Sequence, residues 1–117
     1  MTSLRAHRSV PKRPTDPPLL ILTSLANDPK HGSAPTEDIA EFAGVRLGPG
    51  TLYGAIARLG ERGLIEALPA DGRARPYRIA TAVRQQLADA LTDLQRIVAA
   101  GTARMAAGPW RPAGTEA

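Results

Sequence analysis

The arginines of two short segments are the residues of this sequence best suited to a defined chemistry. Arg58 stands in GPGTLYGAIARLGERGLIE (residues 48–66), and Arg73 and Arg75 stand in DGRARPYRI (residues 71–79). A guanidinium group on an exposed helix face or a loop tip can donate hydrogen bonds to phosphate oxygens or to base edges. The chain carries 15 Lys and Arg against 11 Asp and Glu, a net charge of +4. This balance favours a polyanionic partner.

Catalytic and metal-binding patterns are missing from the sequence. Cysteine is absent, and the histidines number two, His7 and His31. This composition excludes thiol catalysis and thiolate metal sites and makes a histidine cluster improbable. No Gly-rich phosphate loop follows a strand, and no nucleophile elbow is present. We therefore expect no enzyme activity, no cofactor and no metal, and we expect His31 in a turn that orders the second helix.

A first, buried helix is predicted near the N-terminus. Asp16 precedes two prolines, an arrangement typical of a helix start in which the aspartate is the N-cap acceptor. The segment that follows, LLILTSLAND (residues 19–28), is apolar nearly all round. We expect it to be a buried helix that ends before Pro29.

A second, short helix is predicted from Thr36 onward. Two acids follow this threonine, which gives a capped start favoured by the helix dipole. The helix, EDIAEFAG, places Ile39, Phe42 and Ala43 on one side. Gly44 is expected to end it.

The third predicted helix lies within residues 48–66. Its apolar side chains recur at i, i+4 and i+7 and form one stripe toward the core: Leu52, Ile56 and Leu59. The opposite side carries small and polar residues: Thr51, Gly54, Arg58 and Glu61. Such a face can approach another surface closely, as a helix in a major groove must. Gly63 is expected to close the helix in the left-handed conformation.

A β-hairpin is predicted after the third helix. Two short extended runs, Leu64–Leu68 and Tyr77–Ala80, flank a loop centred on Asp71 and Gly72, with Arg73 and Arg75 at its tip. Three short helices followed by a basic-tipped hairpin are the winged helix-turn-helix arrangement. In it the third helix enters DNA and the hairpin lies against the backbone or the minor groove. The expected fold class is mainly α with a small β-hairpin, plus a long C-terminal helix.

Three motifs within residues 19–84 resemble a known family. They are HGS at 31–33, then GPGTLYGAIARLGERGLIE, then DGRARPYRI. They resemble HGY, PGTLYPAL, RLEEEGLI and a wing ending in YRLT in the PadR-like (phenolic-acid decarboxylase regulator) family of bacterial transcription factors. The resemblance implies a dimeric winged-helix repressor, with the third helix and wing on DNA and a C-terminal helix forming the dimer.

The C-terminal segment, residues 81–107, predicts a helix that packs on another helix. Its apolar and small residues alternate spacings of four and three: Leu87, Leu91, Leu94, Val98, Gly101 and Met105. This is a 3.5-residue period, which favours self-association into a homodimer through Leu87, Leu91, Leu94 and Val98. The alternative is that the helix packs only on its own domain.

Candidate DNA contacts each have a plainer alternative. Thr51 either caps the third helix or meets a phosphate or base edge. Tyr53 either packs under a neighbouring helix or donates its hydroxyl to a phosphate. Arg58, Arg73 and Arg75 contact DNA or are simple surface charges. The weaker candidates, which flank helix ends, are Lys30 and Arg46. The basic residues of the N-terminal arm either follow a minor groove or belong to a plain tail: Arg5, Arg8, Lys12 and Arg13.

The expected organisation is a basic disordered arm (1–16), a winged helix-turn-helix domain (17–80), a dimerisation helix (81–107) and a disordered tail (108–117). The longest apolar run is too short to cross a bilayer, and no signal-peptide pattern is found, so we expect a cytoplasmic protein. The predicted function is a DNA-binding regulator, a repressor that binds a pseudo-palindromic operator as a homodimer, with an unidentified effector as a further partner. Its alternative is a winged-helix module that binds protein. Aromatic residues are 3% of the chain and Trp110 lies beyond the helix, so no aromatic-lined drug pocket is expected.

Overall fold

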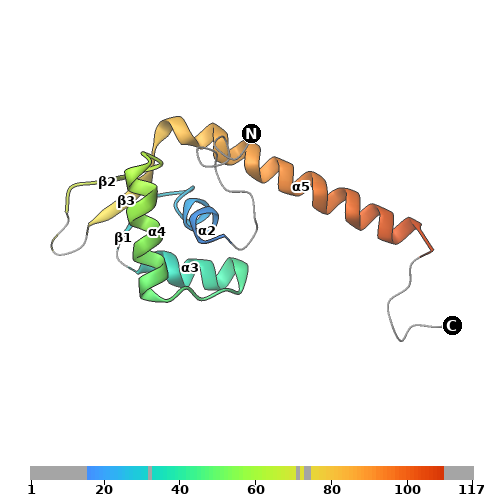
Figure 1. Cartoon of the computed structure of the whole chain (residues 1–117), viewed down its shortest axis with the longest axis horizontal. Coiled ribbons are helices and arrows are strands. Elements are labelled where there is room, and N and C mark those ends of the chain that lie inside the picture. The colour runs from blue at the N-terminus through green and yellow to red at the C-terminus, as the bar shows by residue number, and fades with distance from the viewer. Residues whose placement is uncertain (1–15, 32, 71, 73–74, 110–117) are drawn as a thin grey trace, which may run out of the picture.

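The computed structural model describes residues 16–31, 33–70, 72 and 75–109. It contains three short helices, a small sheet and one long C-terminal helix (Figure 1). The elements in chain order are α2 (Pro17–Ser24), β1 (Lys30–His31), α3 (Ala34–Ala43), α4 (Pro49–Glu61), β2 (Ile65–Ala67), β3 (Pro76–Ile79), the 3₁₀ turn η1 (Thr81–Val83) and α5 (Arg84–Ala107). The three-stranded antiparallel sheet has the order β1-β3-β2. The predicted fold class is confirmed. Within the described ranges, the helices are too short or too polar to span a membrane.

Helix α2 is the centre of the core. Asp16 takes the N-cap position, as predicted, but its side chain makes no capping hydrogen bond. The helix is held instead by burial, because four consecutive side chains, Leu19 to Leu22, are at most 4% exposed. It contacts both α3 and α4. A helix that is apolar all round is stable only when neighbours cover every side of it, and here they do.

Helix α3 begins at Ala34, three residues before the predicted first helical residue, Glu37, and Thr36 is not its N-cap. Its N-cap is Ser33, and Pro35 lies in the first turn, where a proline's fixed φ is already helical and its missing N–H has no intrahelical partner to lose. Gly44 ends the helix with φ of +70°, as predicted. Only part of the predicted apolar side reaches the core, since Ile39 is fully buried whereas Phe42 is 46% exposed.

The sheet contains one strand that the sequence pattern does not reveal. Strand β1 pairs with β3, with Lys30 opposite Tyr77 and His31 opposite Pro76. His31 is therefore a strand residue rather than the turn residue we expected. Two residues are too few to show the alternation by which strands are recognised. The predicted hairpin is present as β2 and β3, with Ile65 opposite Ile79.

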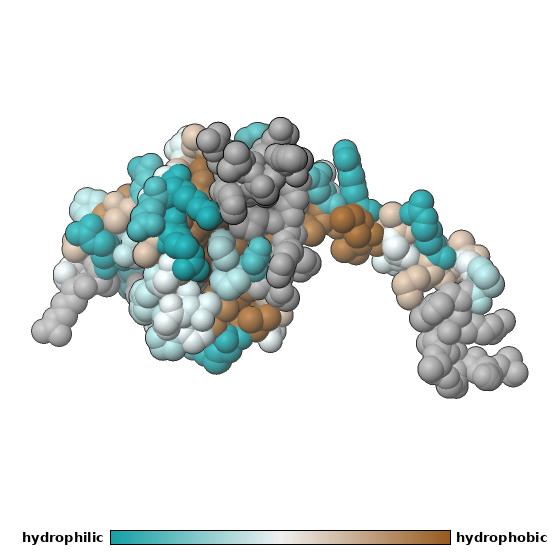
Figure 2. All heavy atoms as spheres, in the orientation of Figure 1, coloured by the Kyte–Doolittle hydropathy of each residue, from teal (hydrophilic) through white to brown (hydrophobic). Residues whose placement is uncertain are grey.

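Helix α5 starts in the core and then leaves it. Its first buried residues, Leu87 and Ala90, pack with the core cluster, and Leu94 is partly buried against the same cluster. Beyond this point the helix projects away from the domain (Figure 1). Apolar side chains gather on the part of α5 that has just left the domain (Figure 2). The molecule is consequently long and narrow, with principal extents of 62 × 34 × 23 Å.

Candidate nucleic-acid interface

Helix α4 is anchored by one face and exposes the other. The predicted stripe is buried, with Leu52 and Leu59 each 1% exposed and Ile56 6% exposed. Thr51 and Arg58, on the outward face, are exposed. Burial of the stripe fixes the rotation of the helix about its axis, and so it fixes which side chains point outward.

The N-terminal end of α4 is suited to an anion. Gly48 occupies the N-cap, no side-chain capping bond is made, and the first turn holds no acidic residue. The free N–H groups and the positive end of the helix dipole are therefore not neutralised by the protein. Thr51 is exposed in the first turn but does not cap the helix, so of its two predicted roles the contact to phosphate or base remains.

Arg58 extends back along the exposed face of α4. A Cβ placed on Gly54 would lie 3.8 Å from Arg58 Nη1, so the guanidinium group passes over the glycine one turn earlier. Helical side chains lean toward the N-terminus in this way. A Cβ at position 54 would make only ordinary van der Waals contact with the guanidinium group, and the arginine reaches toward the end of the helix that is suited to an anion. Tyr53, on the same helix, is 48% exposed rather than packed under a neighbouring helix.

The wing combines exposed cationic and paired residues. Arg75 is exposed immediately before β3, whereas Arg73 lies outside the described residues. Gly72 has φ of +69°, a conformation that favours glycine in the turn. Arg78, which the sequence did not single out, donates to Glu66 across the strands at 3.0 Å, and both are about half exposed. This pair occupies the facing positions of β2 and β3 and stabilises the wing.

Lys30 is part of the fold rather than of the open surface. Its side chain is only 18% exposed, and its ammonium donates to the Ser24 carbonyl, to Asn27 Oδ1 at 2.9 Å and to Asp28 Oδ1 at 3.0 Å. Asp38 lies 3.9 Å away. An ammonium has three protons to donate, and the protein accepts all of them. We therefore remove Lys30 from the candidate DNA contacts.

Arg46 is exposed but already holds a carboxylate. Its Nη1 and Nη2 donate to Glu37 Oε2 and Oε1 at 3.1 and 3.2 Å, a two-bond contact between side chains that are 61% and 74% exposed. The hydrogen bond and charge of the guanidinium hold the pKa of Glu37 below its ordinary value. In return they raise the pKa of Arg46. Arg46 is therefore on the surface, as a DNA contact requires, but its guanidinium group is paired with Glu37.

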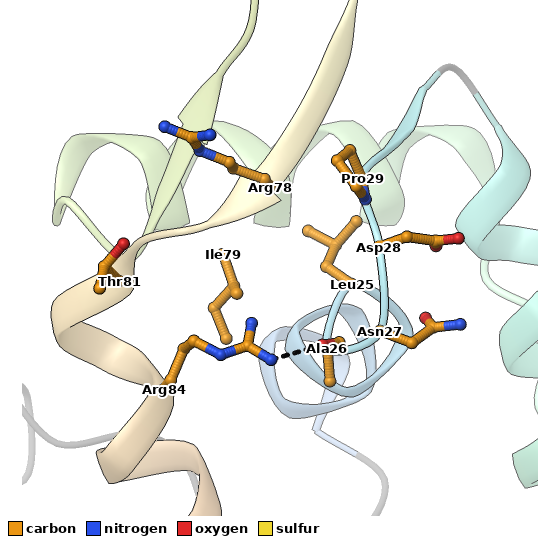
Figure 3. A pocket seen from close by; sticks show the side chains of 9 residues that line it. All are labelled: Leu25, Ala26, Asn27, Asp28, Pro29, Arg78, Ile79, Thr81 and Arg84. Atoms are coloured by element: carbon orange, nitrogen blue, oxygen red, sulfur yellow. Dashed lines mark hydrogen bonds between the residues drawn. The ribbon is translucent and has the colours of Figure 1, made fainter.

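A polar cavity of about 310 Å³ separates the end of α2 from β3 and the start of α5 (Figure 3). Arg84 points into it and donates from Nη2 to the Ala26 carbonyl at 2.8 Å. An adjoining apolar cavity of about 170 Å³ is bounded by Ile79, Leu87 and Leu91 among others. The two partners of the Arg84 contact are 58 positions apart, so no local pattern could have predicted it.

The predicted dimerisation residues fall in two environments. Leu87 is 4% exposed and belongs to the core of its own domain, and Leu94 is partly buried there. Leu91 is 38% exposed and Val98 is 65% exposed. Ile97, which lies outside the predicted spacing, is 69% exposed. The described part of the chain contains no group of three His, Cys, Asp or Glu residues arranged to hold a metal ion.

Sequence comparison finds a partial relative but no family. No family model matches the chain. An uncharacterised 37.1 kDa protein in transposon TN4556 of Streptomyces fradiae is 44% identical over 75 residues, which are 64% of this chain. The match spans 22% of that protein's length.

Comparison with solved structures supports the fold and a regulatory class. The circadian clock associated protein Pex from Anabaena superposes with a TM-score of 0.54 at 23% identity, over 72% of this chain and 78% of Pex. A protein from Thermoplasma acidophilum that is assigned as a transcriptional regulator gives 0.53 at 27% identity, over 73% and 87% of the two chains. The chain thus has the fold of winged-helix transcriptional regulators.

Proposed function

We propose that this protein is a DNA-binding transcriptional regulator that acts as a homodimeric repressor on a pseudo-palindromic operator. The observation that carries the proposal is the outward face of α4. Its N-terminal end has no acid, Thr51 is exposed there, and Arg58 extends toward it over Gly54. A helix presented in this way can place its first turns against base edges while its buried stripe holds it on the domain. Repression is what the resemblance to the PadR-like family implies.

The wing supplies contacts to the DNA backbone that do not depend on the DNA sequence. Arg75 is exposed immediately before β3, and Arg73, two positions earlier in the chain, lies outside the described residues. Arginines at this place in a winged helix meet phosphates or the minor groove. Changing both to Ala is expected to weaken binding to all duplexes alike and to lower the salt slope by about 0.9 for each phosphate that an arginine no longer neutralises.

The spacing of α5 supports an antiparallel dimer. The intervals between Leu87, Leu91, Leu94, Val98, Gly101 and Met105 are four, three, four, three and four residues. This series is the same in both directions, so two antiparallel copies can pair along the exposed part of the helix. Leu91 then faces the partner's Gly101 and Leu94 faces the partner's Val98, whereas Met105 of the partner subunit lies over the apolar cavity beside the buried Leu87.

This register also satisfies shape and distance. A flexible methionine next to Leu87 could fill the apolar cavity of about 170 Å³ beside it, and glycine leaves room for a leucine. The two Leu87 residues would lie about 27 Å apart along the helices, at about 1.5 Å per residue. Two recognition helices must span about 34 Å to meet half-sites one DNA turn apart. The points at which the two α5 helices leave their domains would then be separated by a distance of the same order.

Binding assays on the promoter region of its own gene test the proposed function. The wild-type protein should bind this duplex more tightly than a scrambled one and lose affinity steeply as salt increases. Arg58→Ala should reduce the preference for the operator at a cost of about 1 to 3 kcal/mol if the side chain reaches a base edge. Binding that does not depend on salt would favour the alternative, a module that uses the same face on another protein.

Because the chain has no cysteine, engineered thiols report the dimer directly. The double variant Leu91→Cys/Gly101→Cys should form an intermolecular disulfide under oxidation, since the register places these residues opposite each other. Each single variant is the control and should cross-link poorly. Efficient cross-linking by either single variant alone would instead indicate parallel helices, in which each residue faces its own copy in the partner subunit.

A further inference from the structure

The Arg46–Glu37 pair stands at the place where DNA would pass the domain. Arg46 is two positions before Gly48, the N-cap of α4, and Glu37 lies in the first turn of α3. In a helix-turn-helix the first helix crosses the phosphate backbone while the N-terminal turns of the second enter the groove. A guanidinium in the connecting loop is then within the region of the backbone.

The pair keeps Arg46 from acting as a free cation. Both of its terminal nitrogens are engaged by the Glu37 carboxylate, at 3.1 and 3.2 Å. A phosphate that approaches the end of the guanidinium group would require the same two donors, because arginine binds carboxylate and phosphate with the same planar geometry. A phosphate on the remaining N–H groups would meet the negative charge of Glu37 at short range, so Glu37 and a phosphate compete for Arg46. Since exposed ion pairs are weak, the exchange is accessible when a phosphate is held close.

We propose that Glu37 is a specificity-determining residue, which withholds the Arg46 contact from DNA that does not dock well. On the operator, α4 seats in the groove and holds a phosphate against Arg46, which exchanges Glu37 for it. On other sequences the backbone is not held in place, and Arg46 stays on the carboxylate. Nonspecific binding depends almost entirely on phosphate contacts, so withholding one lowers it more than it lowers specific binding. This inference rests on the proposed function.

The variant Glu37→Gln tests the inference. It removes the competing charge and frees Arg46 for any phosphate. We expect affinity for a scrambled duplex to increase about three- to tenfold, and the salt slope to steepen by about 0.9 for each subunit in which Arg46 binds a phosphate. Affinity for the operator should increase less, so the ratio of the two affinities should fall.

Two controls separate this effect from a general change in charge. Glu41→Gln removes the same charge from an exposed position one turn further along α3 and leaves Arg46 paired. Its effect on scrambled DNA should be clearly smaller. In the Arg46→Ala background, Glu37→Gln should no longer increase the salt slope. Thermal unfolding of each variant establishes that it is folded.

The outcomes distinguish this inference from the function on which it rests. Equal increases in affinity from Glu37→Gln and Glu41→Gln, or an increase that persists without Arg46, would overturn the role of Glu37 and leave DNA binding intact. A wild-type protein that binds no duplex in a salt-dependent way would overturn both.

Discussion

The two ends of α5 share one spacing of apolar residues and lie in opposite surroundings. At the start, Leu87 and Ala90 are 4% and 2% exposed and belong to the core of the domain. Further along the same spacing, Val98 and Met105 are 65% and 52% exposed. A continuous 3.5-residue pattern therefore does not indicate whether its apolar residues pack on their own domain or on another helix. The first turns complete a domain, and the remainder is an apolar surface that a second copy would cover.

The largest effect is expected where the helix is part of the core. Leu87→Ala removes a buried side chain next to an existing cavity, so the free energy of unfolding should fall by about 2 to 5 kcal/mol. Denaturant titration measures it. Leu91→Ala, one turn along and 38% exposed, is the matched control and should cost the domain clearly less. If both variants lost the same free energy of unfolding, the first turn of α5 would contribute no more to the core than the next one.

The next effect concerns assembly rather than folding. Val98→Glu places a charge on the exposed part of the seam, where a dimer would bury it without a partner, so the protein should become monomeric with its domain intact. Light scattering gives the mass, and thermal unfolding tests the domain. The control Thr92→Glu adds the same charge at an exposed position off the seam and should leave the mass unchanged. A wild-type monomer at tens of micromolar, roughly the scale of stable assembly, would contradict the dimer.

The smallest effect is expected at the junction of the two regions. Arg84→Ala removes the hydrogen bond to the Ala26 carbonyl, which ties the first turn of α5 to the end of α2 (Figure 3). A loss of about 0.5 to 1.5 kcal/mol in stability is expected for one such bond. Because the contact helps to hold the first turn of α5 on the domain, the variant should also tolerate altered half-site spacing slightly better than wild type. Arg96→Ala, an exposed arginine further along α5, should alter neither property.

Local patterns predicted the parts of the structure that depend on local chemistry. The stripe of α4, the closing glycines 44 and 63 and the all-round apolar α2 follow from spacing and backbone preference, and each is present. The class of fold followed from their order.

The features that could not be predicted from the sequence depend on contacts between residues distant in the chain. Strand β1 forms because β3 is beside it, and Arg84 is held by a carbonyl 58 positions away. Lys30 and Arg46 appear equally basic in the sequence. Only the fold shows that one is held among carbonyl and carboxylate oxygens and the other by a single exposed acid.

The projecting length of α5 has a consequence for the DNA that a dimer would recognise. If antiparallel helices set the distance between the two domains, one additional heptad in the exposed part would move them about 10 Å further apart. That distance corresponds to about three base pairs at roughly 3.4 Å each. Operator spacing and helix length would then have to change together. Three base pairs are also about a third of a DNA turn, so a duplication or loss of seven codons in this region would move the second half-site off the DNA face that the partner domain meets. Binding to the original operator would then fall without any change in the residues that contact the bases.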